Sequence, residues 1–339
     1  RSSFEPDVFD MSALDLRESI ERVLQFPCVA SKEFLITVGD RSVGGLVVRD
    51  PMVGPWQVPV ADVAVTCQDF CGDSGEAMAM GERSPIAWVH PAASARMAVG
   101  EAITNMAAAS IDQLSDIAFS ANWMAASDYG HDLVGLYDAV QAISMELCPA
   151  LGISIPVGKD SLSMQVQWKD SRGNDHLVAS PVSLVISAVA PVFDVKKTLT
   201  PLLNQEDDTV ILFIDLGEGS HCMGGSVLAQ CYQTIGQRPA DIHHPHHLKA
   251  FFVAIQELKA KDLILAYHDR SDGGLLITLL EMAFASHVGL DIDISSLGAN
   301  KMVALFTEEL GAAIQVRRHE KVRVEAILKN HGLLSMTHA

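Results

Sequence analysis

Cysteine is scarce in this sequence, with six residues scattered through a chain of 339. So few cysteines in so long a chain exclude a disulfide framework and are typical of a reduced, cytoplasmic protein. Cys67 and Cys71 are close in sequence, but no second pair of ligands follows nearby, which argues against a zinc site. The apolar fraction of 49% is ample for a large hydrophobic core, so we expect the core to stabilise the fold.

Basic residues are also scarce, since 24 Lys and Arg face 42 Asp and Glu, for a formal net charge of -18. Such a chain repels the nucleic-acid backbone, and we expect no nucleic-acid partner. An anionic substrate would need a metal ion, a local Lys or Arg, or a helix N-terminus to offset the field. The sequence lacks a signal peptide and any apolar run long enough to span a bilayer, so we expect no membrane partner.

The length favours two domains. We expect a lead-in segment with a helix at 1–32, a first α+β domain at 33–195, a linker at 196–208 and a second α+β domain at 209–339. The linker is charged, contains proline and has no apolar periodicity. The sequence begins at Arg1 and ends at Ala339 without an evident final element, which predicts a piece of a longer chain with a truncated second domain.

Local patterns predict individual elements. The Ala-rich segment 91–109 favours a helix, and the continuous apolar run at 209–215 favours a buried strand. We also expect a strand at 34–38 and a helix or compact turn at 75–82.

The predicted helix at 91–109 carries two oxygen-bearing side chains on one face. Glu101 and Asn105 are four residues apart and therefore lie one above the other. A carboxylate and an amide oxygen in this arrangement form half of a site for a hard cation such as Mg²⁺. The alternative is an ordinary polar stripe on an amphipathic helix.

Two further acids stand out from apolar surroundings. Asp62 lies within the predicted strand 60–66, where a buried carboxylate is costly unless it is paired or binds a metal. The alternative is an outward-facing Asp on an alternating strand. Asp269 belongs to a dense polar cluster, which follows a short strand and precedes a helix at 275–286. Acids at a strand end beside a helix N-terminus suit a cation that holds phosphates.

Other polar segments give weaker signals. Residues 158–161 form a predicted glycine turn that is suited either to a phosphate or to a simple charged hairpin. The glycine-rich loop at 217–225 is either a phosphate-binding loop or a turn. The histidines at 243–247 are adjacent and interrupted by proline, which favours an exposed helix-entry loop over a metal site.

Five motifs in order carry a resemblance that covers nearly the whole chain: GPWQVPVADVAVT at 54–66, GEAITN at 100–105, SANWM at 120–124, GKDSLSM at 158–164 and HDRSDGG at 268–274. They closely resemble the phosphoribosylformylglycinamidine synthase family in its long, single-chain form. The match is to the second of two aminoimidazole-ribonucleotide-synthetase-like repeats, which pack as a pseudo-dimer in that family.

The resemblance implies a ligand set. Asp62, Glu101, Asn105 and Asp269 match magnesium ligands, and Ala61 and Ser271 match nucleotide contacts. Gly158, Lys159 and Ser161 match a turn that contacts nucleotide, metal and substrate in shorter relatives. Lys159 replaces an Asn ligand of those relatives, so a metal role at that position is not carried over.

The family reaction uses ATP to activate the amide oxygen of formylglycinamide ribonucleotide, and ammonia from glutamine then displaces phosphate. The resemblance implies Mg²⁺ and ATP or ADP as cofactors and assigns no catalytic residue to this chain. The first repeat and the glutaminase domain would be its partners. The quartet resembles the family's structural nucleotide site, so we expect the fragment alone to be inactive.

Two alternatives remain. The first is a purely structural half-domain that binds no ligand without its partner repeat. The second is a complete sister enzyme, such as aminoimidazole ribonucleotide synthetase, selenophosphate synthetase or thiamine-monophosphate kinase. The absent glycine-rich start, Trp56 and the Asn122-Trp123 pair argue against the second.

Overall fold

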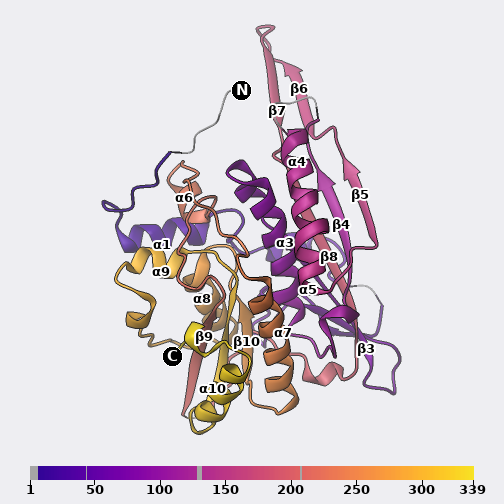
Figure 1. Cartoon of the computed structure of the whole chain (residues 1–339), viewed down its shortest axis with the longest axis vertical. Helices are drawn as coiled ribbons and strands as arrows, with labels where there is room; N and C mark the ends of the chain where they lie inside the picture. The colour runs from indigo at the N-terminus through magenta and orange to yellow at the C-terminus, as the bar shows by residue number, and fades with distance from the viewer. Residues whose placement is uncertain (1–6, 43, 128–131, 207) are drawn as a thin grey trace.

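The computed structural model describes residues 7–42, 44–127, 132–206 and 208–339. Within them, six strands of the first half form one sheet in the order β1-β2-β3-β8-β4-β5 (Figure 1). Neighbouring strands are antiparallel except β4 and β5, which are parallel. The strands are β1 (Val47–Arg49), β2 (Ala64–Cys67), β3 (Gly75–Glu82), β8 (Ser183–Val192), β4 (Ala118–Met124) and β5 (Val157–Ser161).

Helix α3 (Pro91–Met106) covers one face of this sheet and is buried along almost its whole length. Strand β3 alternates buried and exposed residues, and its Gly81 faces the helix. A Cβ added to Gly81 would lie 2.0 Å from the carbonyl oxygen of Ala98, so the two backbones approach closely because both elements carry small residues. The elements that follow β4 are α4 (Asp132–Gln141), a π-helical segment (Ala142–Leu147) and α5 (Cys148–Leu151).

The second half contains a smaller antiparallel sheet in the order β10-β11-β9-β12. Side chains such as Phe213, Ala266 and Ala313 pack with helix α8 on one face of this sheet. The strands are β9 (Thr209–Asp215), β10 (Ala266–Asp269), β11 (Gly311–Arg317) and β12 (Thr337–His338). The helices are α6 (Val227–Cys231), α7 (Pro245–Ala260), α8 (Gly274–Ser286), α9 (Lys301–Phe306) and α10 (Lys321–Asn330).

One hydrophobic cluster joins the two sheets. It includes Ile103 of α3, Phe251 of α7 and Ile314 of β11, all fully buried. The hydroxyl of Tyr267 in β10 also donates a hydrogen bond to the carbonyl oxygen of Thr104 in α3 at 2.6 Å. The end of β10 therefore lies against α3, and the two elements bring the polar segments of both halves together.

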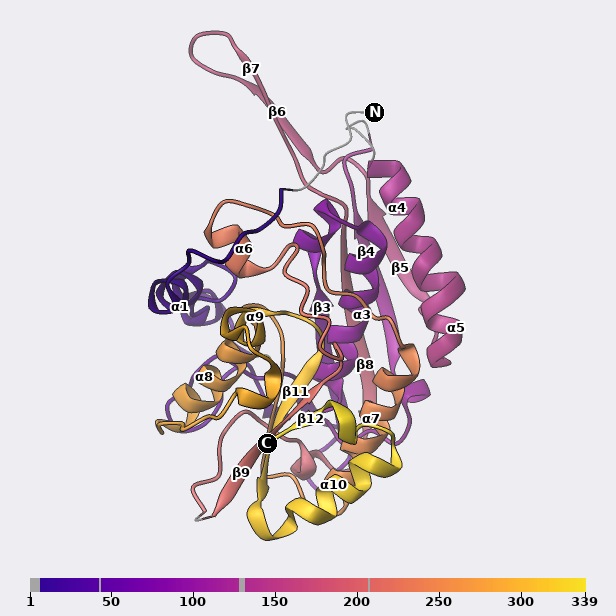
Figure 2. The ribbon, with the colours of Figure 1, turned by 60° about the vertical axis from the view of Figure 1, so that its left-hand side comes forward.

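Peripheral elements complete the chain. Helix α1 (Leu16–Gln25) packs on α6, and α2 (Glu33–Thr37) follows it. The hairpin of β6 (Gln165–Lys169) and β7 (Asp175–Ala179) projects away from the body (Figures 1 and 2). No described helix combines the length and the apolar character of a membrane span. Short 3₁₀ segments lie at Ser84–Trp88, Leu114–Asp116, Val195–Lys197, Ser295–Leu297, Arg318–Glu320 and Leu334–Met336.

The α+β class expected from the sequence is confirmed, and the expected elements at 91–109 and 209–215 are α3 and β9. Three local predictions are wrong, and the third, the turn expected at 158–161, is described with the site below. The strand expected at 60–66 begins only at Ala64, so Asp62 lies in the loop before it. Segment 34–38 contributes to helix α2 at the surface, where no described strand pairs with it. Segment 75–82 is strand β3, because pairing with β2 and β8 outweighs the helix propensity of its Ala, Met and Glu residues. Residues 1–6 of the expected lead-in and residue 207 of the expected linker lie outside the described residues.

Candidate functional site

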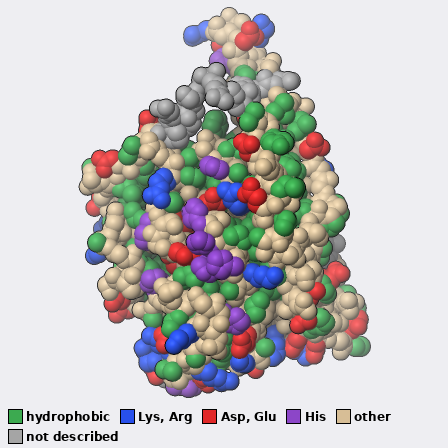
Figure 3. All heavy atoms as spheres, viewed as in Figure 1, with side chains coloured by type: hydrophobic (Ala, Val, Ile, Leu, Met, Phe, Trp, Pro, Cys, Tyr) green, Lys and Arg blue, Asp and Glu red, His purple; other side chains and the backbone are tan. Residues whose placement is uncertain are grey.

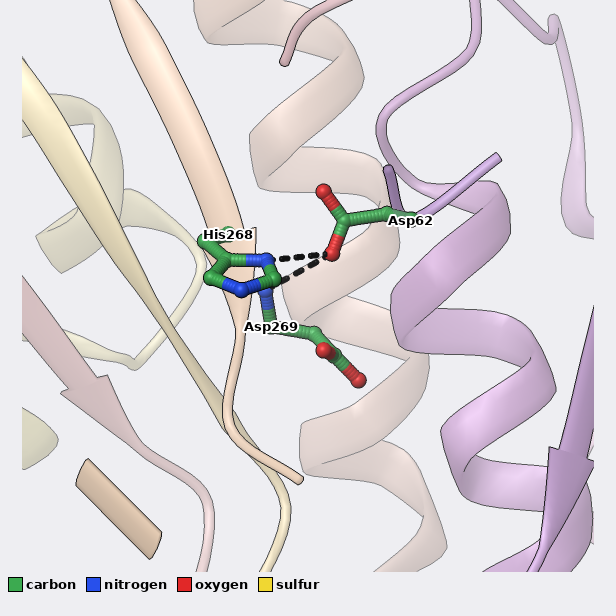
Figure 4. Close-up of side chains that lie close together, drawn as sticks. All are labelled: Asp62, His268 and Asp269. Atoms are coloured by element: carbon green, nitrogen blue, oxygen red, sulfur yellow. Dashed lines mark hydrogen bonds and ion pairs between the residues drawn. The ribbon is translucent and has the colours of Figure 1, made fainter. Parts of the chain in front are cut away.

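The carboxylate of Asp62 is the centre of the candidate site. It lies in the loop before β2, and only 1% of its side chain is exposed. Its Oδ1 accepts hydrogen bonds from Nδ1 of His268 at 2.8 Å and from the backbone N–H of Asp269 at 3.1 Å (Figure 4). Its Oδ2 is buried and has no hydrogen-bond partner among the described residues. An unsatisfied buried acceptor costs about 1–3 kcal/mol, so this oxygen is available to a ligand.

His268, near the end of β10, lies between two carboxylates. Its Nδ1 faces Asp62, and its Nε2 lies 2.8 Å from Oε2 of Glu281 on α8. Burial acts to lower the pKa of His268, but the two carboxylates and their hydrogen bonds hold that pKa well above its ordinary value. Both ring nitrogens therefore donate, and the imidazolium orients Asp62 rather than binding a metal ion.

Asp269 supplies the second carboxylate. Its Oδ2 accepts a hydrogen bond from the hydroxyl of Thr104 at 3.2 Å. Burial and the neighbouring charge of Asp62 raise the pKa of Asp269 well above its ordinary value. Potential ligand atoms of Asp62, His268 and Asp269 lie within 4.8 Å of one another. Because His268 is a donor, two carboxylates remain, and they fit a hard divalent cation that keeps several water ligands.

Glu101 lies in a neighbouring charged cluster and is outside that group of three. Its Oε2 accepts a hydrogen bond from the backbone N–H of Glu82 at 2.7 Å, and its Oε1 accepts one from the hydroxyl of Ser271 at 2.5 Å. Nε of Arg83 lies 3.4 Å from Oε1 of Glu101. Burial raises the pKa of Glu101, although Arg83 acts in the opposite direction. Both oxygens of this carboxylate are thus occupied by protein groups.

Asn105 lies one turn further along α3. Its amide nitrogen donates to the carbonyl oxygen of Met80 in β3 at 3.0 Å. Since Glu101 bonds to Glu82 of the same strand, the expectation that Glu101 and Asn105 share a helix face is confirmed. In this structure both side chains fasten α3 to β3, and the amide oxygen of Asn105 accepts no hydrogen bond from the described residues.

The two residues expected to contact nucleotide, Ala61 and Ser271, are neighbours of Asp62 and Glu101, respectively. Ala61 precedes Asp62, and its backbone N–H donates to the carbonyl oxygen of Pro51 at 3.3 Å. Ala61 and Asp62 line a cleft of about 440 Å³, together with residues of the β1 segment. Ser271 follows β10 and donates its hydroxyl to Glu101.

The expected turn at 158–161 is wrong. Gly158, Lys159 and Ser161 belong to strand β5, which pairs in parallel with β4. Strand β5 is the edge strand, and β3, β8 and β4 separate it from β2. Nζ of Lys159 donates to the hydroxyl of Ser161 at 2.6 Å. The structure therefore does not bring these three residues to the site around Asp62.

Arg83 is the main residue of this region that the sequence analysis missed. Its side chain is 2% exposed and lies 2.9 Å from Asp272 and 3.8 Å from Glu308. Burial acts to lower the pKa of Arg83, but the surrounding carboxylates raise that pKa above its ordinary value. Burial and Asp272 raise the pKa of Glu308 to about 8, against the effect of Arg83. A basic residue between β3 and the helix that carries Glu101 was an available signal in so acidic a chain.

Two conspicuous sequence features have structural explanations. The guanidinium of Arg270 is buried, pairs with Asp215 at 2.6 Å and donates to the carbonyl oxygen of Leu310. Figure 3 shows histidine side chains on one face of the molecule. The rings of His246 and His247 lie 4.0 Å apart at the start of α7, but the histidines of 243–247 form no metal-ligand group within the described residues.

Family models match both halves of the chain. The model described as "FGAR-AT PurM_N-like domain" matches residues 31–191. The model described as "AIR synthase related protein, C-terminal domain" matches residues 205–337. The two matches follow one another without overlap, and the first spans the larger sheet almost completely and the second the smaller one.

Solved structures with this fold include Thermotoga maritima PurL complexed with FGAR, at 13% identity and a TM-score of 0.59 over 85% of this chain and 44% of that chain. T. maritima PurL complexed with ADP has 13% sequence identity and a TM-score of 0.55, and the match covers 85% of this chain and 43% of that chain. A structure of a HypE–HypF complex has 14% sequence identity and a TM-score of 0.56, and the match covers 81% of this chain and 84% of that chain. These identities show the fold alone. The chain spans less than half the length of the PurL chains that it matches.

Proposed function

Because the chain consists of an AIR synthase-like N-terminal domain followed by an AIR synthase-related C-terminal domain, we propose that it is the synthetase part of an ATP-dependent ligase. The reaction is the conversion of FGAR, ATP and glutamine to formylglycinamidine ribonucleotide in purine synthesis. The five sequence motifs and the FGAR-AT description of the first family model support this substrate. The chain is then the second repeat of a longer cytoplasmic enzyme, in keeping with its six free cysteines.

The observation that carries the proposal is the buried, unpaired Oδ2 of Asp62 beside the carboxylate of Asp269. Two acids at this spacing repel each other, and a bound cation removes both the repulsion and the unsatisfied acceptor. Mg²⁺ bound here would neutralise the phosphates of ATP or ADP. His268 holds Oδ1 of Asp62 in place, so that Oδ2 alone faces the ligand.

Ser271, Ala61, Glu101 and Asn105 have the supporting roles. Ser271 is fixed by Glu101 and would contact the nucleotide through its hydroxyl, while Ala61 would line the cleft beside Asp62. Asn105 offers a free amide oxygen as a further ligand. Glu101, whose oxygens are both occupied, is the least accessible of the four proposed ligands.

The complete reaction requires partners. We propose that the first repeat and the glutaminase domain supply the remaining catalytic groups and the ammonia, and that this chain alone is inactive. Gly158, Lys159 and Ser161, which lie on the far edge of the sheet, would serve a second site formed with the first repeat.

Calorimetric titration with ADP and Mg²⁺ tests the proposal. Asp62→Asn removes a ligand charge and should weaken MgADP binding at least about tenfold. Asp112→Asn, at an exposed position, is the matched control and should bind as the wild type does. Equal affinity of Asp62→Asn and wild type refutes the metal assignment. A flat wild-type titration, with an intact circular dichroism spectrum, supports a purely structural half-domain instead.

A second candidate is a complete enzyme of the same fold with another substrate. The match to the HypE–HypF complex covers 84% of the chain in that structure, as expected for a whole two-domain protein. ATP hydrolysis by the purified chain separates the candidates. Turnover with a small substrate of a sister enzyme, in the absence of FGAR and glutamine, supports the second candidate, whereas turnover only after addition of the missing repeat and glutaminase supports the first.

A further inference from the structure

A second cleft, of about 560 Å³, lies where the two halves meet, and its lining is strongly basic. One wall comes from the first half, with Arg49 at the end of β1 and Lys196 and Lys197 after β8. The other wall comes from the second half, with Lys259 and Asp262 at the end of α7 and Arg317 at the end of β11. Five basic residues and one acid thus line this cleft in a chain whose formal net charge is -18, although burial lowers the pKa of Lys259 well below its ordinary value.

Most of these cations are available to a ligand. Lys196 pairs with Asp73 at 2.7 Å, Lys197 pairs with Asp262 at 3.5 Å, and Arg317 pairs with Glu206. These pairs are at least one-third exposed, so they contribute little to stability and exchange readily for a more highly charged anion. Lys259 differs, because its Nζ is buried and donates to the carbonyl oxygens of Ala107 and Ala109.

Arg49 supplies the second observation. Its Nε is buried and has no hydrogen-bond partner, and its side chain forms no ion pair with the described residues. Every other cation of the cleft has a protein partner. A guanidinium donates through a planar fork that fits two oxygens of a phosphate, so Arg49 is suited to an anion that enters the cleft.

We propose that this cleft binds a small anion with two or more phosphate charges, with Arg49 as the principal contact and Lys196, Lys197 and Arg317 around it. The volume suits a ligand the size of a nucleotide or a sugar phosphate. Because both halves contribute cations, the anion fixes one half relative to the other. The cleft adjoins the cleft of Asp62, because Arg49, Leu199, Thr200 and Leu202 line both, but neither Asp62 nor Asp269 lines this one. Its occupation requires no divalent cation.

Calorimetric titration with inorganic pyrophosphate in EDTA tests the proposal. Wild type should bind, with an affinity that falls as salt is added, and Arg49→Gln should bind at least roughly tenfold more weakly. Lys197→Gln and Arg317→Gln should each weaken binding several-fold. Arg172→Gln on the projecting hairpin and Asp62→Asn should leave the affinity unchanged.

Arg41→Gln distinguishes the two clefts, because Arg41 lines the cleft of Asp62 and not this one. Absence of wild-type binding, equal affinity of Arg49→Gln and wild type, or loss of binding in Arg41→Gln or Asp62→Asn would each overturn the proposal. Arg49→Lys, which keeps the charge, should retain part of the affinity if Arg49→Gln fails to fold. MgADP titration of Lys197→Gln, at a residue that lines this cleft and not the cleft of Asp62, should match wild type, so the outcome is independent of the proposed function.

Discussion

Replacement of Gly81 by alanine is a direct test of how closely β3 packs on α3. The added Cβ would lie 2.0 Å from the carbonyl oxygen of Ala98 and 2.6 Å from the backbone nitrogen of Ala102, whereas ordinary contacts are 3.4–4 Å. Neither atom belongs to a flexible side chain, so the helix or the strand must move by more than an ångström. Overpacking of this kind costs about 3 kcal/mol, which in a chain of 339 residues should lower Tm by about 4 °C.

The same displacement reaches the candidate site, because Glu101 and Asn105 bond to the residues on either side of Gly81. Urea unfolding followed by circular dichroism measures the loss of stability, and MgADP titration measures the effect on the site. Gly39→Ala is the matched control, since a Cβ there meets nothing within 4 Å. Should Gly81→Ala unfold at the same urea concentration as Gly39→Ala, the close helix–strand packing described above is wrong.

Three further predictions concern buried charges and the edge strand. The folded-state pKa of Glu308, about 8, lies above its ordinary value of 4.5, so the contribution of Glu308 to stability is complete below pH 4.5 and is lost as pH rises through 8. Glu308→Gln should therefore make the midpoint of urea unfolding less dependent on pH over that range. Arg270→Met leaves Asp215 buried without its partner and should cost about 3–5 kcal/mol in urea unfolding, whereas an effect below 1 kcal/mol contradicts the buried pair. Lys159→Gln should not change the affinity for MgADP, because β5 is an edge strand remote from β2. Weaker binding would show that β5 contributes to the MgADP site.

The sequence predicts the acids of the site better than their partners. Asp62 and Asp269 stand out because a charge in an apolar segment needs a partner, and this rule is local. The pairing of Asp62 with His268 joins residues 206 positions apart, and only the fold brings them together. Likewise, the spacing of Glu101 and Asn105 predicts their common face, but not that β3 occupies it.

Strand pairing explains two of the wrong local predictions. Segment 75–82 has helix-favouring residues, yet its position between β2 and β8 makes it a strand. Segment 158–161 contains glycine and charged residues typical of a turn, yet it pairs with β4. A Cβ at Gly158 would lie 2.8 Å from the carbonyl oxygen of Ala121, so the glycine permits the close contact between the two strands. Such contacts depend on segments remote in sequence, which composition does not reveal.

Helix α3 contributes to the hydrophobic cluster shared by both sheets, and Tyr267 ties the second sheet to its backbone. A chain cut between the halves would expose the apolar surface of this helix on one fragment and the matching surface on the other. Neither fragment would then keep the free energy of the shared cluster, so heating should melt both sheets in a single calorimetric peak.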